Sequence, residues 1–192
     1  MAQTEGATRE VNGVSVPPVG EYEIDGSHTD AEFVARHLLS KVRGKFGDVS
    51  GTITIAERPE DSHAEVEIKT ASVNTGDAKR DGHLNSGDFF ETEKYPTMTF
   101  KSTGLRLTGG NNFELDGDLT IKDTTKSITL KGEFLGWGKD MTGEDRVFAE
   151  AKTRVNREEW GLSWNMAVEL TGVLVAKEVD LELQVQAAKS EE

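Results

Sequence analysis

Cysteine is absent from the 192 residues, which excludes disulfide frameworks, thiolate metal sites and cysteine nucleophiles. The chain also lacks any apolar run approaching the roughly 18 residues that a membrane-spanning helix needs. Residues 1–10 show no basic start followed by an apolar stretch, so no secretory signal is recognised. We therefore expect a soluble, cytoplasmic protein with no integral membrane segment.

Positive charge is also in short supply. The chain has 22 Lys plus Arg against 35 Asp plus Glu, a formal net charge of −13. Lys and Arg neutralise the phosphate backbone of nucleic acids, so the charge predicts no nucleic-acid partner and disfavours broad contact with anionic lipid surfaces. Proline is scarce, with 4 residues against 20 glycines, a balance suited to strands joined by hairpins.

The dominant pattern that is present is alternation of apolar and polar residues with period two, which is typical of half-buried strands. In residues 64–69, for example, Ala64, Val66 and Ile68 share one face and the charged residues share the other. The same pattern covers residues 22–25, 52–55, 97–101, 113–121, 127–131, 147–155 and 179–186. Turn signals separate these segments, so we expect an all-β domain of about eight strands.

Consecutive hairpins of one-faced strands imply an antiparallel sheet that must close or stack, because open apolar edges invite aggregation. We favour a closed eight-stranded barrel over a two-sheet sandwich because the strands are long, and a strand of about ten residues reaches roughly 33 Å. A barrel of that height can enclose one elongated ligand. The domain is expected over residues 21–187, between a flexible N-terminal tail (1–20) and a C-terminal tail (188–192).

Two segments break the alternation. Residues 29–39 fit either a helix or a strand, and intrinsic propensity favours the helix. The connection from 71 to 95 is too long for a hairpin, and long structured connections tend to be functional or to form a packed cap. Its apolar residues Leu84, Phe89 and Phe90 indicate a short helical cap over one barrel mouth.

Three tracts resemble the YceI-like polyisoprenoid-binding family: residues 22–28 (YEIDGSH), 80–90 (RDGHLNSGDFF) and 95–102 (YPTMTFKS). Residues 117–121 (GDLTI) and 156–161 (NREEWG) are similar to later family motifs, so the resemblance covers about residues 20–187. It implies an extended, lipocalin-like antiparallel barrel whose apolar channel holds a long isoprenoid chain. It also implies that residues 33–37 form a strand. The sequence departs from the family pattern in two ways. The secretion signal that many relatives carry is not recognised in it, and Thr29 stands where the family usually has Ser.

The candidate channel residues are the large apolar side chains on the expected inward face. They are Phe33, Val66, Ile68, Met98, Phe100, Leu115, Leu119, Ile128, Leu130, Leu181 and Leu183. Each could instead be plain core, because a narrow barrel fills its interior with side chains. Four small residues on the same faces, Ala64, Gly117, Ala149 and Ala151, are expected to leave room. Phe148, Trp160 and Trp164 are expected at an end of the barrel or outside it.

The candidate ligand-binding residues of the mouth or cap are polar or aromatic. They are His28, His37, Arg80, His83, Asn85, Phe89 and Phe90. The histidines, with His63, include no i, i+4 pair, so we expect hydrogen-bonding roles, with no metal and no cofactor. Arg80 and Asp81 are expected to pin the cap to the barrel.

Residues 33–47 contain Arg36, Lys41, Arg43 and Lys45 and no acid, so a local charge of +4 lies within an acidic chain. This segment is either a solvated basic loop paired with neighbouring carboxylates, which we favour, or a site for an anionic head group.

The leading functional hypothesis is binding or carriage of a long-chain isoprenoid lipid, such as a polyprenyl phosphate or an isoprenoid quinone. The alternative is a ligand-free, stress-related or interaction module whose barrel is filled by side chains. An enzyme acting on a small amphiphile would need a polar cluster inside the barrel. The sequence contains no serine elbow, phosphate loop or metalloprotease spacing, so we expect no enzyme. The oligomeric state is open, and a homodimer is a possible outcome.

Overall fold

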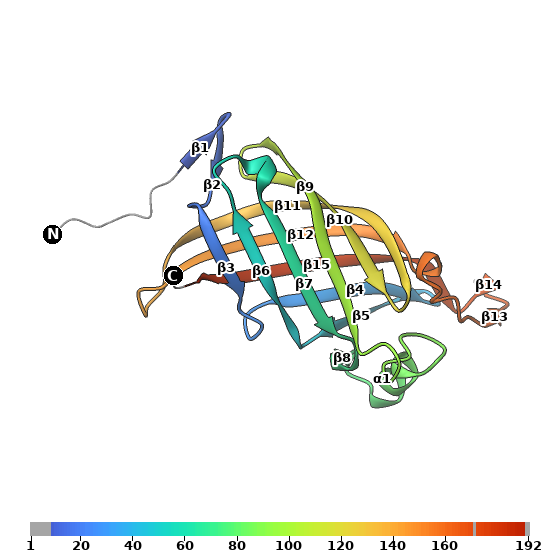
Figure 1. The fold of residues 1–192 in the computed structure, drawn as a ribbon. Helices are drawn as coiled ribbons and strands as arrows, with labels where there is room; N and C mark the ends of the chain where they lie inside the picture. Colours follow the sequence, from blue (N-terminus) through green and yellow to red (C-terminus); the bar gives the residue numbers. More distant parts are fainter. Residues whose placement is uncertain (1–8, 171, 191–192) are drawn as a thin grey trace.

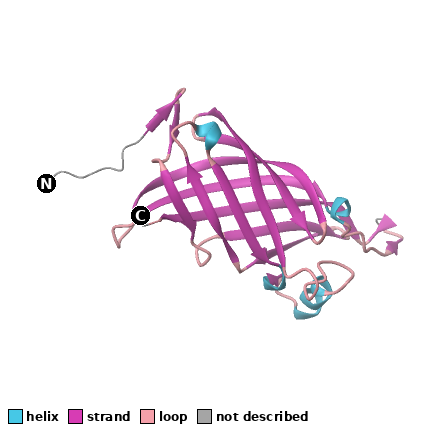
Figure 2. Ribbon diagram, viewed as in Figure 1, coloured by secondary structure: helices cyan, strands magenta, loops and turns pink. Residues whose placement is uncertain are grey.

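A closed antiparallel barrel forms the body of the computed structural model, which describes residues 9–170 and 172–190 (Figures 1 and 2). Its eight strands are β3 (Gly20–Ile24), β6 (Val49–Ile55), β7 (His63–Lys69), β9 (Thr97–Gly109), β10 (Asn112–Ile121), β11 (Thr124–Lys139), β12 (Asp145–Asn156) and β15 (Val175–Lys189). They pair in the order β12-β11-β10-β9-β7-β6-β3-β15, and β15 pairs back onto β12. The expected all-β, eight-stranded barrel is confirmed.

The pairing that closes the barrel joins β12 to β15 in one continuous register, from Arg146 opposite Ala188 to Asn156 opposite Glu178. Alternation places Ala149, Ala151 and Val155 of β12 on the inner face. Closure pairs the backbone N–H and C=O groups of the two sheet edges, and it buries the apolar face of each strand.

The segment that helix propensity assigns to a helix is a strand, so that prediction is wrong. β4 (Asp30–His37) continues along the edge of β15 where β3 ends, and it forms a hairpin with β5 (Ser40–Phe46). Pairing on both sides of β4 supplies more backbone hydrogen bonds and burial than local propensity can oppose. The strand that the family resemblance implies over residues 33–37 is confirmed.

The long connection carries the expected short helix. It contains a 3-10 turn (Thr70–Ser72), β8 (Val73–Asn74), which pairs with the end of β5, and α1 (Ala78–Asn85). Asp77 is the N-cap residue of α1, and its carboxylate accepts hydrogen bonds from the backbone N–H groups of Lys79 and Arg80, both at 3.0 Å. Figure 1 shows α1 beside one end of the barrel, which also carries β13 (Ala167–Val168) and β14 (Gly172–Val173). We call this the α1 end.

The opposite end, which we call the terminal end, carries a hairpin of β1 (Arg9–Val11) and β2 (Val14–Val16) and the last residues of β15 (Figure 1). Val14 and Val16 are buried, and the Arg9 guanidinium donates to the carbonyl oxygen of Ala56 at 2.8 Å. Residues 9–16, which the prediction places in the N-terminal tail (1–20), thus form a hairpin held by the burial of Val14 and Val16 and by the Arg9 hydrogen bond. β15 similarly runs to Lys189, inside the C-terminal tail expected over 188–192. Residues 1–8, 191 and 192 lie outside the described residues.

The remaining elements are two short 3-10 helices, η1 (Pro59–Asp61) between β6 and β7 and η3 (Arg157–Trp160) after β12. Among the described residues, no helix is long and apolar enough to cross a membrane.

Aromatic rings lie over inward-facing glycines of neighbouring strands. A Cβ atom at Gly117 would lie 2.3 Å from Cζ of Phe100, and one at Gly132 would lie 2.2 Å from Cζ of Phe113. Gly117 therefore does not widen the barrel interior as predicted, because the ring of Phe100 occupies the space. A strand glycine here marks the close approach of a neighbouring side chain.

A second apolar cluster lies at the terminal end and consists of Tyr22, Ile55, Val147 and Ala187. The Tyr22 side chain is 1% exposed, and its hydroxyl donates to the carbonyl oxygen of Pro18 at 3.0 Å. Burial, with a smaller contribution from the nearby carboxylate of Asp145, raises the pKa of Tyr22 to about 12. The neutral phenol is thus the form that the fold stabilises.

We expect Tyr22→Phe to reduce the fall in the free energy of unfolding that occurs at alkaline pH. The pKa of Tyr22 is about 12 in the folded chain and about 10 in an unfolded one. The stabilisation is therefore complete below pH 10 and is lost as the pH rises toward 12. Since one pKa unit corresponds to about 1.4 kcal/mol, the parent should lose up to roughly 3 kcal/mol more than the variant across this range. Urea unfolding at several pH values measures the difference, and equal slopes would contradict it.

We expect Gly117→Ala to destabilise the barrel by about 1–3 kcal/mol, because the new methyl group collides with the Phe100 ring and overpacks the interior. Gly136→Ala is the matched control, since a Cβ atom there meets nothing within 4 Å. Its effect should stay within about 0.5 kcal/mol. Urea unfolding of both variants checks this, and equal losses would show that the ring contact is unimportant.

Candidate functional site

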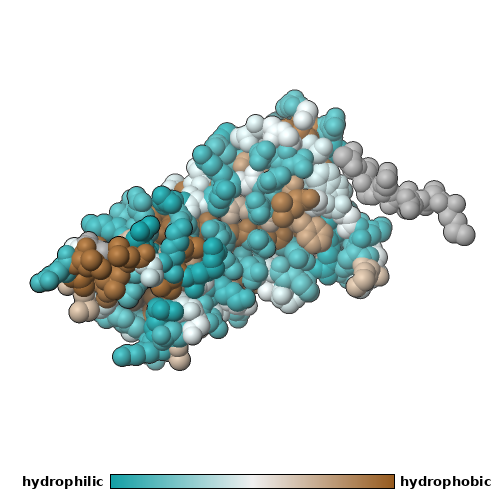
Figure 3. Space-filling view, turned by 180° about the vertical axis from the view of Figure 1, so that it is seen from behind, coloured by the Kyte–Doolittle hydropathy of each residue, from teal (hydrophilic) through white to brown (hydrophobic). Residues whose placement is uncertain are grey.

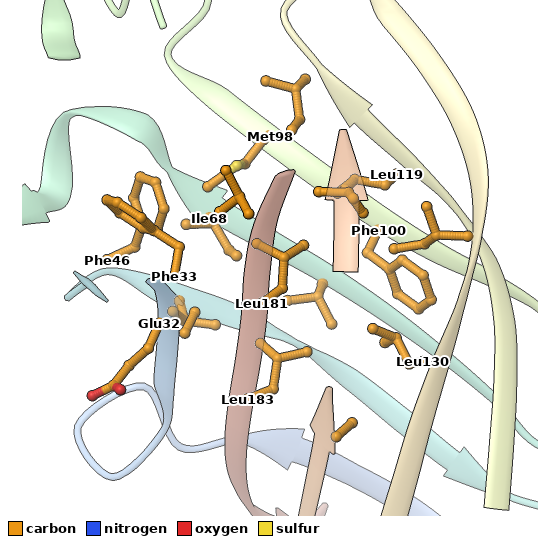
Figure 4. A pocket seen from close by; sticks show the side chains of 18 of the residues that line it. Glu32, Phe33, Phe46, Ile68, Met98, Phe100, Leu119, Leu130, Leu181 and Leu183 are labelled. Atoms are coloured by element: carbon orange, nitrogen blue, oxygen red, sulfur yellow. The ribbon is translucent and has the colours of Figure 1, made fainter. Parts of the chain in front are cut away.

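The barrel encloses an elongated cavity of about 920 Å³. All eleven predicted channel residues line it, from Phe33 on β4 to Leu183 on β15. In Figure 4, Ile68 of β7, Met98 and Phe100 of β9, and Leu181 of β15 direct their side chains into the same space. Alternation predicts these positions correctly because period two fixes which side chains face the interior. Their contact with a ligand stays a prediction.

The middle of the cavity is apolar because the charged side chains of its strands face outward. Glu32, on β4 between lining residues, turns its carboxylate away from the apolar side chains (Figure 4). Outside, the Arg43 guanidinium donates to the carboxylates of Glu32 and Glu182, both at 2.6 Å. Within the described part of the chain, no three His, Asp or Glu side chains are grouped so that they could hold a metal ion.

Polar side chains gather where the cavity reaches the α1 end. The lining there includes His37, Asp77, Lys79, Arg80 and His83. Unlike the apolar middle, this rim can offer charge and hydrogen-bonding groups to the polar end of an amphiphile. The lining also includes Thr54, Ser62 and His63, where β6 ends and β7 begins, so polar groups lie at both ends of the apolar bore and the cations Lys79 and Arg80 lie at the α1 end.

His83 is held at this mouth by aromatic rings and a carboxylate. Its ring packs edge-on against Trp164, with centroids 4.5 Å apart, and against Phe89, at 5.1 Å. Its Nε2 lies 2.8 Å from the Asp88 carboxylate, and 37% of the side chain remains exposed. These contacts fix the imidazole between the cap and the segment that precedes β13.

Arg80 and Asp81 fasten α1 through Thr75, the positioning role that the sequence predicts. The Asp81 carboxylate accepts from the backbone N–H of Thr75 at 2.9 Å and from its hydroxyl at 2.6 Å. Arg80 donates through Nε to the Thr75 hydroxyl at 2.7 Å and through a second nitrogen to the Thr75 carbonyl at 3.0 Å. Because β8 immediately precedes Thr75 and pairs with β5, α1 is tied to the edge of the barrel.

The other predicted cap residues divide between the cavity and the interior of the cap. Phe89 and Phe90 are buried and line the cavity, and Phe90 packs edge-on against Phe46 at 5.5 Å. Asn85 is absent from the lining. Its side-chain amide donates to the carbonyl of Asp81 at 2.8 Å, so it supports α1 from within.

His28 lies away from the mouth, contrary to the prediction. Its side chain is 61% exposed, and its Nδ1 lies 2.9 Å from the Asp25 carboxylate, which also accepts from Arg146 at 2.7 Å. Hydrogen bonds from Ser27, Arg146 and His28 hold the pKa of Asp25 well below its usual range. The turn that carries His28 is anchored to Gln186, near the end of β15, and so belongs to the terminal end.

The basic segment 33–47 agrees in part with each of the two alternatives, a loop paired with carboxylates and a site for an anionic head group. Arg43 pairs with carboxylates, as above, and Lys45 lies 3.6 Å from Asp30. Arg36 and Lys41 are exposed and face each other across the β4–β5 hairpin, next to its turn. The carboxylate pairing that we favour therefore describes one half of the segment, and the cations beside the turn remain accessible.

Sequence reasoning missed the role of Arg157 and the burial of Trp160, which lies at the α1 end of the barrel. Both side chains are buried and line the cavity. Arg157 donates to the backbone carbonyls of Ala176, Leu162 and Val175, and burial lowers its pKa. The indole N–H of Trp160 donates to the carbonyl of Leu119 at 2.9 Å. The NREEWG motif is the signal that could have marked them, since Asn156 caps the turn that turns both side chains inward.

Comparisons with known proteins agree on one family. The model of the YceI-like domain matches residues 22–187. A UPF0312 protein of Azotobacter vinelandii is 34% identical over 92% of this chain and 91% of its own length. The crystal structure of a Campylobacter jejuni YceI protein matches with a TM-score of 0.70 at 29% identity, covering 81% of this chain and 90% of that one.

A polyisoprenoid binding domain from Saccharophagus degradans matches with a TM-score of 0.65 at 16% identity, covering 90% of this chain and 99% of that one, and it supports the fold alone. The family model spans nearly all of the barrel, and relatives above 30% identity align over most of both chains. The chain therefore belongs to the YceI-like family.

Proposed function

We propose that this protein binds or carries a long-chain isoprenoid lipid inside the barrel. The observation that carries the proposal is the elongated, largely apolar cavity of about 920 Å³, whose lining includes the charged side chains of Lys79 and Arg80 at the α1 end. The Saccharophagus degradans domain that shares this fold is described as polyisoprenoid-binding.

The energetics suit a long hydrocarbon. Burial contributes about 0.8 kcal/mol per CH₂, so one prenyl unit of about five carbons contributes roughly 3–4 kcal/mol before ordering costs. A few units are enough for firm binding, and a tail needs no polar partner along its length. We assign the tail to the bore and the head group to the rim formed by His37, Lys79, Arg80 and His83.

Two head groups fit this rim. A polyprenyl phosphate would receive charge-assisted contacts from Lys79 and Arg80, although the guanidinium of Arg80 is already engaged with Thr75. An isoprenoid quinone would accept a hydrogen bond from His83 or stack against Trp164. Both remain within the proposal, and the extraction experiment below distinguishes them.

The two alternatives are less well supported. A ligand-free module requires a bore filled by side chains, and the cavity argues against it. An enzyme requires reactive polar groups inside the bore, and the convergent side chains in its middle are apolar (Figure 4).

We further propose a cytoplasmic location and, as an option for the assembly, a homodimer. Cell fractionation and light scattering test these two points.

Organic extraction of the purified protein followed by mass spectrometry tests the ligand class directly. We expect a polyprenyl phosphate or an isoprenoid quinone at a substantial molar ratio to protein. Protein that yields neither lipid, and that also fails to take up added prenyl lipid, would refute the proposal.

We expect Ala151→Phe to reduce the retained lipid several-fold. Ala151 lines the cavity, so a phenyl ring there takes up part of the bore. Lys152→Phe is the matched control, because the neighbouring residue faces outward on the same strand. Lipid per mole of folded protein is compared by mass spectrometry, with thermal melting to confirm folding. Equal retention in both variants would place the lipid elsewhere.

A further inference from the structure

Three large apolar side chains are exposed at the tip of the α1 end. Leu39 is 65% exposed in the β4–β5 turn, Met166 is 55% exposed before β13, and Leu170 is 70% exposed between β13 and β14. The two loops are fastened together, because the Leu38 N–H donates to the Leu174 carbonyl at 2.8 Å and the Leu174 N–H donates to the Met166 carbonyl at 2.9 Å. Figure 3 shows a hydrophobic patch at this end of the molecule.

This patch is continuous with the cavity. Met166 and Leu174 both line the cavity, and Met166 is also exposed at the tip. An apolar chain can therefore pass from the surface into the bore along apolar side chains. Exposed apolar groups at the entrance to a lipid site are typical of contact with a partner or a membrane.

Charge around the patch favours an anionic surface. Arg36 and Lys41 are exposed next to Leu39, and Lys79 is exposed on α1. The acids near this tip include Glu169, Asp77, Asp81, Asp88 and Glu158. All but Glu169 have partners, since α1 N–H groups donate to Asp77, Thr75 donates to Asp81, and Asp88 and Glu158 pair with His83 and Lys177. The whole chain carries −13, so anionic lipid repels the rest of the barrel and attracts this end.

We infer that the α1 end docks onto a bilayer that contains anionic phospholipid and exchanges the prenyl lipid across this contact, an inference that rests on the proposed function. Leu39, Met166 and Leu170 enter the interface between head groups and acyl chains, and Arg36, Lys41 and Lys79 contact phosphate. The net charge still opposes broad contact with the membrane, and docking is confined to the tip.

Flotation with vesicles tests the docking. The probe is vesicles of phosphatidylcholine and phosphatidylglycerol (3:1), with pure phosphatidylcholine for comparison, and the protein is the full chain. The test variant is Leu39→Asp with Leu170→Asp. The control is Leu135→Asp with Met141→Asp, because these exposed side chains lie on β11 and in the β11–β12 turn, away from the tip.

The test variant should lower partitioning onto the anionic vesicles at least tenfold, and the control should lower it less than twofold. Pure phosphatidylcholine and added salt should both weaken binding of the parent, since the phosphate contacts are screened. The docking inference is overturned if the parent does not float with anionic vesicles or if both variants lose binding equally. It is also overturned if the patch substitutions change only the oligomeric state in light scattering, which would identify a self-association surface.

Uptake of detergent-dispersed prenyl lipid, measured on the same proteins, separates the two proposals. The test variant should keep the parent's uptake, because its substitutions lie outside the bore. A parent that floats with vesicles but takes up no prenyl lipid would refute the proposed function and leave a membrane contact standing. A parent that takes up lipid and does not float would refute the docking alone.

Discussion

The pairing of β12 with β15 is the contact on which the rest of the structure depends. It joins the two edges of a sheet whose strands each have one apolar face, and closure converts those faces into the wall of a bore. Without that pairing, the same strands would expose two long edges. The cavity is thus a product of closure, since eight long strands enclose more space than their inward side chains fill.

The two ends of this bore are built differently. At the terminal end, Tyr22 packs with Ile55, Val147 and Ala187, and Val14 and Val16 of the β1–β2 hairpin are buried. At the α1 end, the barrel wall is completed by short elements tied together by side chains, above all through Thr75. Long regular strands give way there to a helix and turns that carry polar groups. The difference places the charged lining side chains Lys79 and Arg80 at the α1 end of a largely apolar bore.

The distribution of charge supports the same division. Arginines on the outer surface pair with carboxylates of neighbouring strands, as Arg43 does with Glu32 and Glu182 and Arg154 does with Asp180. Exposed pairs of this kind contribute little to stability, but they keep charge on the outside of strands whose other face lines the bore. Arg157 differs from these exposed arginines, because it is buried and donates to backbone carbonyls. Its function is to hold the α1 end together.

The sequence by itself determined which residues face the interior. Period-two alternation is a local property of an extended chain, so Val66, Ile68 and Leu181 could be assigned to the bore without knowing their neighbours. The tertiary structure alone decided what depends on distant segments. Residues 30–37 are a strand because β15 and β5 pair with them, and His28 lies at the terminal end because its turn is anchored to Gln186. The space beside Gly117 is filled because the ring of Phe100 reaches across from β9. Alternation fixes the face on which a side chain lies, whereas strand order and register fix what it meets there.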